Sequence, residues 1–199
     1  MQNKAIYIQL IGDALIPLLG FFLWDWSLYF ILLFYLLDLI ASEVVMLFKA
    51  KRAQGSDQDM KRPYRLYSWA LFVFNLITFH VGIFMMHPNV DFSKEIMDFI
   101  MYEEMGIPQG LILIPLVGFI AYQQYQMEFI RTGVFTRAVA SMMWARHLVD
   151  RLNILLFALA LVLLLIFVPI SEMTVLITIV IISSGYQLLL SFRSKPARK

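Results

Sequence analysis

Six long apolar segments constrain this chain more than any other feature of its sequence. They cover residues 5–23, 28–48, 68–87, 109–129, 152–169 and 173–192. A helix needs about 20 apolar residues to cross about 30 Å of hydrocarbon. Lipid satisfies no backbone hydrogen bonds, so helices are the natural spanning structure for such segments. We therefore expect an all-α, polytopic membrane protein in which residues 1–199 form a single integral membrane domain with six transmembrane helices.

The composition agrees with this interpretation. Hydrophobic residues make up 61% of the chain and charged residues only 15%, whereas soluble domains average about 45–50% and about 25%. These values exclude a disordered chain and argue against a soluble enzyme. The chain has no cysteine, which excludes disulfides, thiolate metal sites and cysteine nucleophiles.

The connecting segments alternate in charge. Residues 49–67 and 130–151 are basic, the tail after 192 is basic, and residues 88–108 are acidic with Lys94 as their one base. If both termini are cytoplasmic, fifteen of the sixteen Lys and Arg residues lie inside. Basic residues mark the cytoplasmic side of membrane proteins, so we expect six spans with N- and C-termini cytoplasmic. This explains the basic character without a nucleic-acid partner.

One connection is expected to be helical itself. Residues 133–150 alternate apolar side chains with Arg137, Arg146 and His147 at helical spacing. Such a pattern is typical of an interfacial amphipathic helix that turns its arginines toward lipid phosphate, with Trp144 at the headgroup level. Residues 91–105 repeat the pattern with acidic residues on the outer side. The turn Gly55-Ser56-Asp57 is expected to be flexible.

Four stretches of the chain carry a resemblance to a known family. They are LIPLLGFFLWDWSLYFILLFYLLDLIASEVVMLFK (15–49), FHVGIFMMH (79–87), RLNILL (151–156) and the Ser183-Ser184-Gly185 segment. The chain resembles an uncharacterised bacterial family of small polytopic membrane proteins, known as a domain of unknown function. The resemblance implies a multi-pass protein of the bacterial inner membrane, and it implies no activity and no functional residues.

Several polar residues fall inside the expected spans. A charged carboxylate at mid-bilayer costs about 2.5–3.5 kcal/mol on insertion scales, so such groups face the bundle interior, are paired or are protonated. Depth along the spans predicts a candidate intramembrane polar site formed by residues near the midplane. Its members are Asp13, Asp38, Thr78, His80 and Ser183.

Each of these groups also has a structural interpretation. Pro17 frees the carbonyl of Asp13, which creates either a cation or proton site or a kink whose acceptors are satisfied by neighbours. His80 beside Asp38 or Asp13 would form a proton relay, and the alternative is a neutral histidine hydrogen-bonded between helices. Glu43 lies about 140° around the helix from Asp38, and we expect it to pair with an arginine.

Other polar positions favour helix packing. Gly82, Ser184 and Gln187 lie on helix faces where small or hydroxyl residues allow close contact. Ser184-Gly185 does not fit the turn of a hydrolase nucleophile. The three histidines do not have the spacing of metal ligands, so no catalytic residue, metal site or cofactor is predicted.

A short internal repeat is present. LIPLLGFF at 15–22 recurs as LIPLVGFI at 113–120, in helices expected to run in opposite directions. Inverted repeats with Pro and Gly in matching places are typical of transporters, although a Leu-rich alphabet also produces such matches by chance.

Three functions remain open from the sequence. The first is a small proton- or cation-linked transporter or channel, and the second is a non-catalytic subunit or scaffold of a membrane complex. An intramembrane enzyme is the third, and no motif supports it. The expected partners are the lipid bilayer and either another membrane protein or further copies of the chain.

Overall fold

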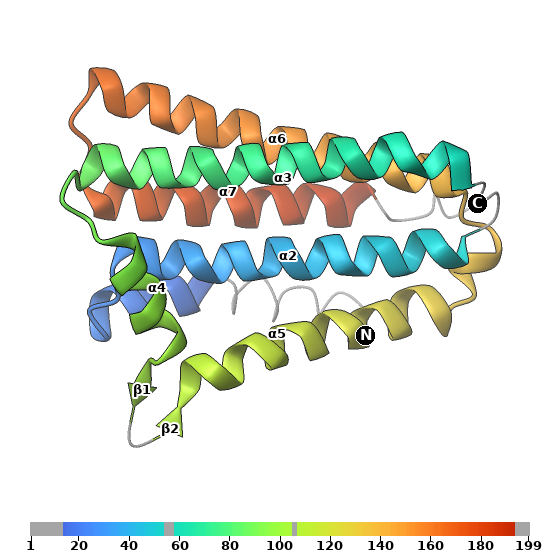
Figure 1. Ribbon diagram of the computed structural model, residues 1–199, viewed down its shortest axis with the longest axis horizontal. Coiled ribbons are helices and arrows are strands. Elements are labelled where there is room, and N and C mark those ends of the chain that lie inside the picture. Colours follow the sequence, from blue (N-terminus) through green and yellow to red (C-terminus); the bar gives the residue numbers. More distant parts are fainter. Residues whose placement is uncertain (1–13, 54–57, 105–106, 194–199) are drawn as a thin grey trace. The chain divides into compact units, whose positions relative to one another are not determined.

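The computed structural model describes residues 14–53, 58–104 and 107–193. Nearly all of this chain is helical, as expected (Figure 1). The elements in chain order are the helix Ala14–Leu23, α2 (Leu28–Arg52), α3 (Gln58–Met86), α4 (Phe92–Ile100), β1 (Glu103–Glu104), β2 (Ile107–Pro108), α5 (Gln109–Tyr125), the π-helix η1 (Gln126–Ile130), the 3-10 helix η2 (Val134–Thr136), α6 (Ala140–Phe167) and α7 (Glu172–Arg193).

Each predicted apolar segment is helical over nearly all of its described part. Among the described residues, three helices are long and apolar enough to cross a membrane: Leu28–Arg52, Pro63–Met86 and Ala140–Phe167. Shorter apolar helices cover Ala14–Leu23 and Glu172–Tyr186. This finding indicates a membrane protein. The number of spans and their orientation remain predictions.

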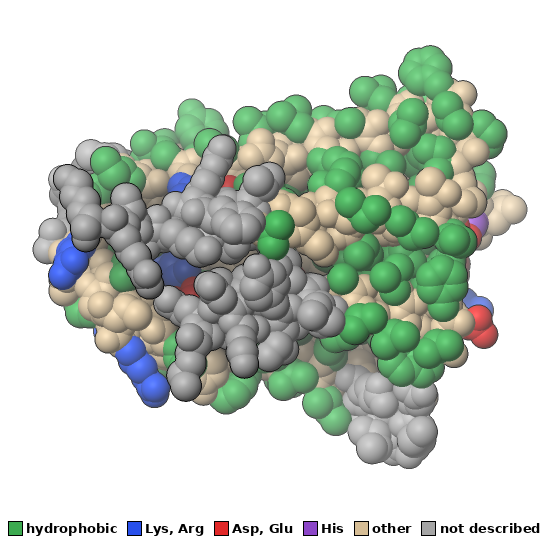
Figure 2. Space-filling view, turned by 180° about the vertical axis from the view of Figure 1, so that it is seen from behind, with side chains coloured by type: hydrophobic (Ala, Val, Ile, Leu, Met, Phe, Trp, Pro, Cys, Tyr) green, Lys and Arg blue, Asp and Glu red, His purple; other side chains and the backbone are tan. Residues whose placement is uncertain are grey.

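Large apolar side chains are exposed along these helices. Leu66 is 69% exposed, Ile181 64% and Phe167 81%. Figure 2 shows hydrophobic side chains over much of the visible described surface. A monomeric soluble protein rarely exposes large contiguous apolar patches, whereas helices that face lipid do so throughout their length.

The contacts divide the chain into two units. The first contains residues up to Ile31 together with Pro169 onward, and the second contains Leu32–Val168. In the first unit a tight turn follows the helix Ala14–Leu23. There Asp25 has a φ of 50°, and the Trp26 backbone N–H donates to the carbonyl of Gly20 at 3.0 Å. A Cβ on residue 20 would collide with the Trp26 ring, so glycine is required at this position.

In the second unit, α2, α3 and α6 pack together. One face of α2 carries Leu39, Glu43, Met46 and Ala50, all of them buried. Their spacing of three and four residues places them on one side of a helix. Met46 and Ala50 pack against Trp144 of α6. This three-helix core holds the candidate site.

The short helix α4 lies within the acidic segment 91–105, where the sequence predicted a helix. The Asp91 side chain accepts a hydrogen bond from the Lys94 backbone N–H and so caps the first turn. Phe99 lies edge-on to Phe34 of α2, with ring centroids 5.1 Å apart. The ring of Phe92 lies 5.0 Å from that of His80 on α3. These aromatic contacts fix α4 across one end of the α2–α3 pair.

The prediction of a separate interfacial helix over 133–150 is wrong. Gly133 adopts a φ of 69° and η2 follows it, after which α6 runs without a break from Ala140 to Phe167. Trp144 is only 2% exposed and packs against Met46 and Ala50 of α2, so its ring is inside the helix packing and not at the surface. The amphipathic pattern of this segment reflects burial against α2 and α3. Residues 55–57, where the flexible turn was predicted, lie outside the described residues.

Candidate functional site

A buried carboxylate lies at the centre of the three-helix core. Glu43 is 5% exposed and sits on the inward face of α2, between Leu39 and Met46. Helical phase alone directs it there, because residues 39, 43 and 46 share one side of the helix. The expectation that Glu43 is paired with an arginine is confirmed.

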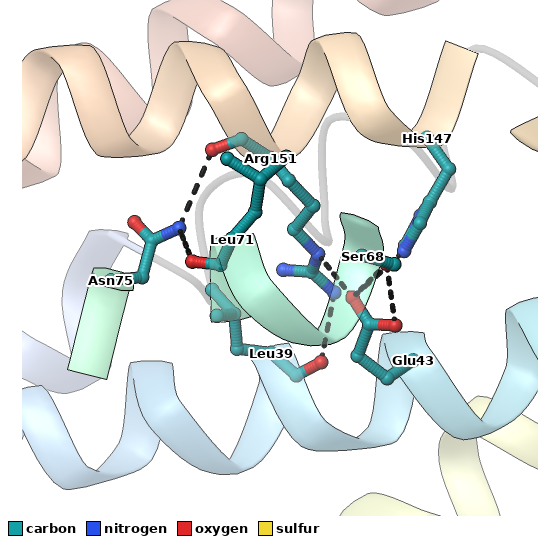
Figure 3. Close-up of polar contacts among 7 residues, drawn as sticks. All are labelled: Leu39, Glu43, Ser68, Leu71, Asn75, His147 and Arg151. Carbon is teal, nitrogen blue, oxygen red and sulfur yellow. Dashed lines mark hydrogen bonds and ion pairs between the residues drawn. The ribbon is translucent and has the colours of Figure 1, made fainter. Parts of the chain in front are cut away.

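Three side chains from two other helices converge on this carboxylate (Figure 3). Arg151 of α6 donates from Nε to Oε1 at 2.9 Å. Nε2 of His147, one turn earlier in α6, lies 2.9 Å from the same oxygen. The Ser68 hydroxyl of α3 lies 3.0 Å from Oε1 and 2.9 Å from Oε2. We call Glu43, Ser68, His147 and Arg151 the carboxylate cluster.

Arg151 links both the side chain and the backbone of α2. It is 3% exposed, and its Nη2 donates to the carbonyl of Leu39 at 2.8 Å. A buried guanidinium stays protonated and needs acceptors for its N–H groups. The Glu43 carboxylate and the Leu39 carbonyl supply them, so the two opposite charges are buried as a pair.

Asn75 ties α3 to α6 beside the cluster. It is fully buried, and its Nδ2 donates to the carbonyl of Leu71 at 2.9 Å and to that of Arg151 at 3.4 Å. Ser68, Asn75 and Gly82 are spaced seven residues apart, which puts them on one face of α3. A Cβ at Gly82 would lie 3.2 Å from Val162 of α6. Small and polar residues therefore line the α3–α6 contact.

The midplane residues predicted from sequence are found in several environments. Asp38 is on the exposed side of α2, within electrostatic range of Arg151. Thr78 is buried, and its hydroxyl donates to the carbonyl of Phe74 at 2.8 Å. His80 has Nδ1 2.8 Å from the carbonyl of Leu76. Asp13 lies outside the described residues.

The remaining predicted residues belong to α7, in the first unit. Ser183 donates to the carbonyl of Val180 at 3.1 Å. The Ser184 hydroxyl is buried and has no hydrogen-bond partner among the described residues. The side chain of Gln187 is not among those described.

Among the predicted site residues that the structure describes, Asp38 is the acid within electrostatic range of Arg151 in the carboxylate cluster. His80 lies 12 residues beyond Ser68 along α3, about 18 Å at 1.5 Å per residue, against Phe92 of α4. A direct relay between His80 and Asp38 stays a prediction.

Sequence reasoning missed His147, Arg151 and Ser68 as partners of the buried carboxylate. The two α6 residues were assigned to a basic connection, because a cluster of bases usually marks a solvated segment. A signal was present in the spacing of Trp144, His147, Arg151, Leu155 and Ala158, which repeats every three or four residues. That periodicity continues unbroken into the apolar segment and indicates one helix with an inward stripe.

The cluster is suited to holding and exchanging a proton. A carboxylate and an imidazole in direct contact can share a proton. The guanidinium supplies a permanent positive charge. Within the described parts of the chain, no three His, Cys, Asp or Glu residues are grouped so that they could hold a metal ion.

Comparison with known proteins gives no match. No protein-family model, no curated protein and no solved structure matches the chain. The resemblance to a bacterial family of small membrane proteins stays a prediction from the sequence.

Proposed function

We propose that the chain is a multi-pass protein of the bacterial inner membrane with six spans and both termini in the cytoplasm. The charge distribution within the second unit supports this orientation. Lys51 and Arg52 are exposed at the end of α2, and Arg137 and Arg146 are exposed near the start of α6. These ends lie together, opposite the acidic α4 (Figure 1). The positive-inside rule then assigns the basic end to the cytoplasm.

Within this membrane protein we propose a small proton-linked transporter or channel. The single observation that carries the proposal is the Glu43 carboxylate, buried in an apolar helix and bound to both Arg151 and His147. Ionisable groups inside membrane segments commonly mark ion or proton pathways. An arginine alone would neutralise a purely structural carboxylate, whereas the added imidazole gives the cluster a second proton-binding group.

Proton flux through purified protein in liposomes tests this proposal. A pH-sensitive dye inside the vesicles reports flux driven by a potential across the membrane. We expect Glu43→Gln to abolish flux, because an amide keeps the size of the side chain but cannot carry the proton. Asp98→Asn, on the exposed surface of α4, is the matched control and should retain flux. Equal flux from both variants, or none from the parent protein, would refute the proposal.

A specific observation also favours a non-catalytic subunit as the second candidate. Oε1 of Glu43 is contacted by three side chains from two helices. An oxygen with this many hydrogen-bond partners suits a carboxylate whose role is to hold α2, α3 and α6 together. This alternative predicts a stoichiometric membrane-protein partner, or a stable homo-oligomer, in mild detergent. A monodisperse monomer that conducts protons would count against it.

A further inference from the structure

Two buried polar atoms near the carboxylate cluster have no hydrogen-bond partner among the described residues. They are Nε1 of Trp144, a donor, and Oδ1 of Asn75, an acceptor. Trp144 is 2% exposed and Asn75 is fully buried. Buried polar atoms are almost always hydrogen-bonded to protein or to ordered water, so both positions call for a ligand that can satisfy them.

The orientation of the Asn75 amide is fixed by its neighbours. Its nitrogen faces the carbonyls of Leu71 and Arg151, and both are acceptors, so an exchange of nitrogen and oxygen would set acceptor against acceptor. Figure 3 shows the amide oxygen turned away from these two carbonyls. The oxygen therefore needs a donor from another direction.

The Trp144 indole lies beside the cluster's imidazole. The rings of Trp144 and His147 are 5.9 Å apart and nearly perpendicular. His147 uses Nε2 toward Glu43, and the described residues provide no partner for its Nδ1. With Nε2 donating to the carboxylate, a neutral imidazole presents Nδ1 as an acceptor. The Trp144 and His147 rings are therefore neighbours, and no hydrogen bond joins them directly.

We propose that buried water completes the carboxylate cluster at both positions. One water accepts from Trp144 Nε1 and donates to His147 Nδ1, and a second donates to Asn75 Oδ1. Water is the ligand that fits, because it is small and can donate and accept hydrogen bonds at the same time. Side-chain accessibility supports the first site, since the His147 side chain is 11% exposed.

This inference deepens the proposed function and rests on it for its role. A hydrated proton arriving at the first water protonates Nδ1 of His147, and the Nε2 proton then passes to Glu43. One proton enters and one is delivered, which leaves a neutral imidazole of the other tautomer and a neutral carboxyl group. Trp144 and His147 are three residues apart on α6, about 4.5 Å along the helix axis, so the first water would lie beside the proton-binding pair.

Two variants test the water sites directly. Trp144→Phe removes the indole N–H and retains an aromatic ring, and Asn75→Leu removes the amide oxygen. Trp69→Phe and Asn153→Leu, both at exposed positions, are the matched controls. The probe is water itself. Its magnetisation transfer to the labelled groups and the indole N–H stretching frequency are measured in detergent-solubilised protein with isotope-labelled tryptophan and asparagine.

We expect magnetisation transfer from water to the Trp144 indole N–H and the Asn75 amide, together with an indole N–H stretch at the lower frequency of a hydrogen-bonded group. We also expect neither Trp144→Phe nor Asn75→Leu to raise the melting temperature. An indole N–H at the free-group frequency without water transfer, combined with a stabilising Trp144→Phe substitution, would overturn the inference.

These signals are independent of flux. Bound water in a protein that conducts no protons would refute the proposed function and uphold the water sites. Proton flux through a protein whose Trp144 indole N–H shows no bound water would uphold the proposed function and refute the water sites.

Discussion

Arg151 and Glu43 depend on each other, because each is buried and each satisfies the other. Replacing a buried ion pair with apolar residues often leaves stability unchanged, but removing one partner leaves the other as an unpaired buried charge. When Arg151 is removed, Ser68 and His147 partly compensate the unpaired Glu43 carboxylate, since both contact it already. The unpaired charge nevertheless keeps most of its desolvation cost.

We therefore expect Arg151→Met to lower the free energy of unfolding by about 3–5 kcal/mol, and the double variant Glu43→Gln with Arg151→Met to recover part of this loss. Thermal unfolding in detergent measures both. Arg146→Met is the control, because Arg146 is exposed on the same helix. If the double variant were as unstable as the single one, the pair would not be interdependent.

Gly110 is fixed by a close backbone approach. A Cβ at this position would collide with the carbonyl oxygens of Phe99 and Ile100, and backbone atoms cannot move aside as a flexible side chain can. Gly118, in the same helix α5, has open space around it.

Gly110→Ala should therefore destabilise the junction of α4, the β1–β2 pair and α5. Gly118→Ala should be neutral or stabilise by up to about 1 kcal/mol, because alanine favours helix. Melting temperatures of the two variants check this prediction. Equal effects would mean that Gly110 is not held against α4.

At the scale of elements, the continuity of α6 decides where the site lies. Its 28 residues extend about 42 Å at 1.5 Å per residue, more than the thickness of the hydrocarbon. Because the helix does not break near residue 150, His147 and Arg151 present one face to α2 from successive turns.

A proline in this helix tests its continuity. Val149 is exposed between His147 and Arg151, so Val149→Pro should cost about 3 kcal/mol or more and separate the two side chains. Val149→Ala should be nearly neutral. Circular dichroism and thermal unfolding distinguish the cases, and a well-tolerated proline would restore the idea of two separate helices.

At the scale of the whole molecule, the proposed orientation in the membrane can be tested directly. The absence of native cysteine allows single-cysteine labelling without background. In intact bacterial cells, we expect a membrane-impermeant thiol reagent to label Asp98→Cys in α4 and to leave Arg137→Cys unreacted until the cells are opened. The opposite pattern would invert the proposed topology.

Hydrophobic periodicity in the sequence predicted most of the helices. The predicted segments 28–48 and 173–192 correspond to α2 (Leu28–Arg52) and α7 (Glu172–Arg193). Helical phase also separated Glu43 from Asp38, and the expected position of Glu43 near the cytoplasmic end of its span predicted an arginine partner. These features are local, since they depend only on apolar length and on 3.6 residues per turn.

Tertiary structure alone decided which arginine, and which further groups, meet that carboxylate. Ser68 and Arg151 stand 25 and 108 residues from Glu43, and no local pattern relates positions so distant. A base in a connecting segment and a base in a buried pair look alike in sequence. Burial is a property of the helices that pack around a residue, so His147 and Arg151 acquired their role only when α6 packed against α2 and α3.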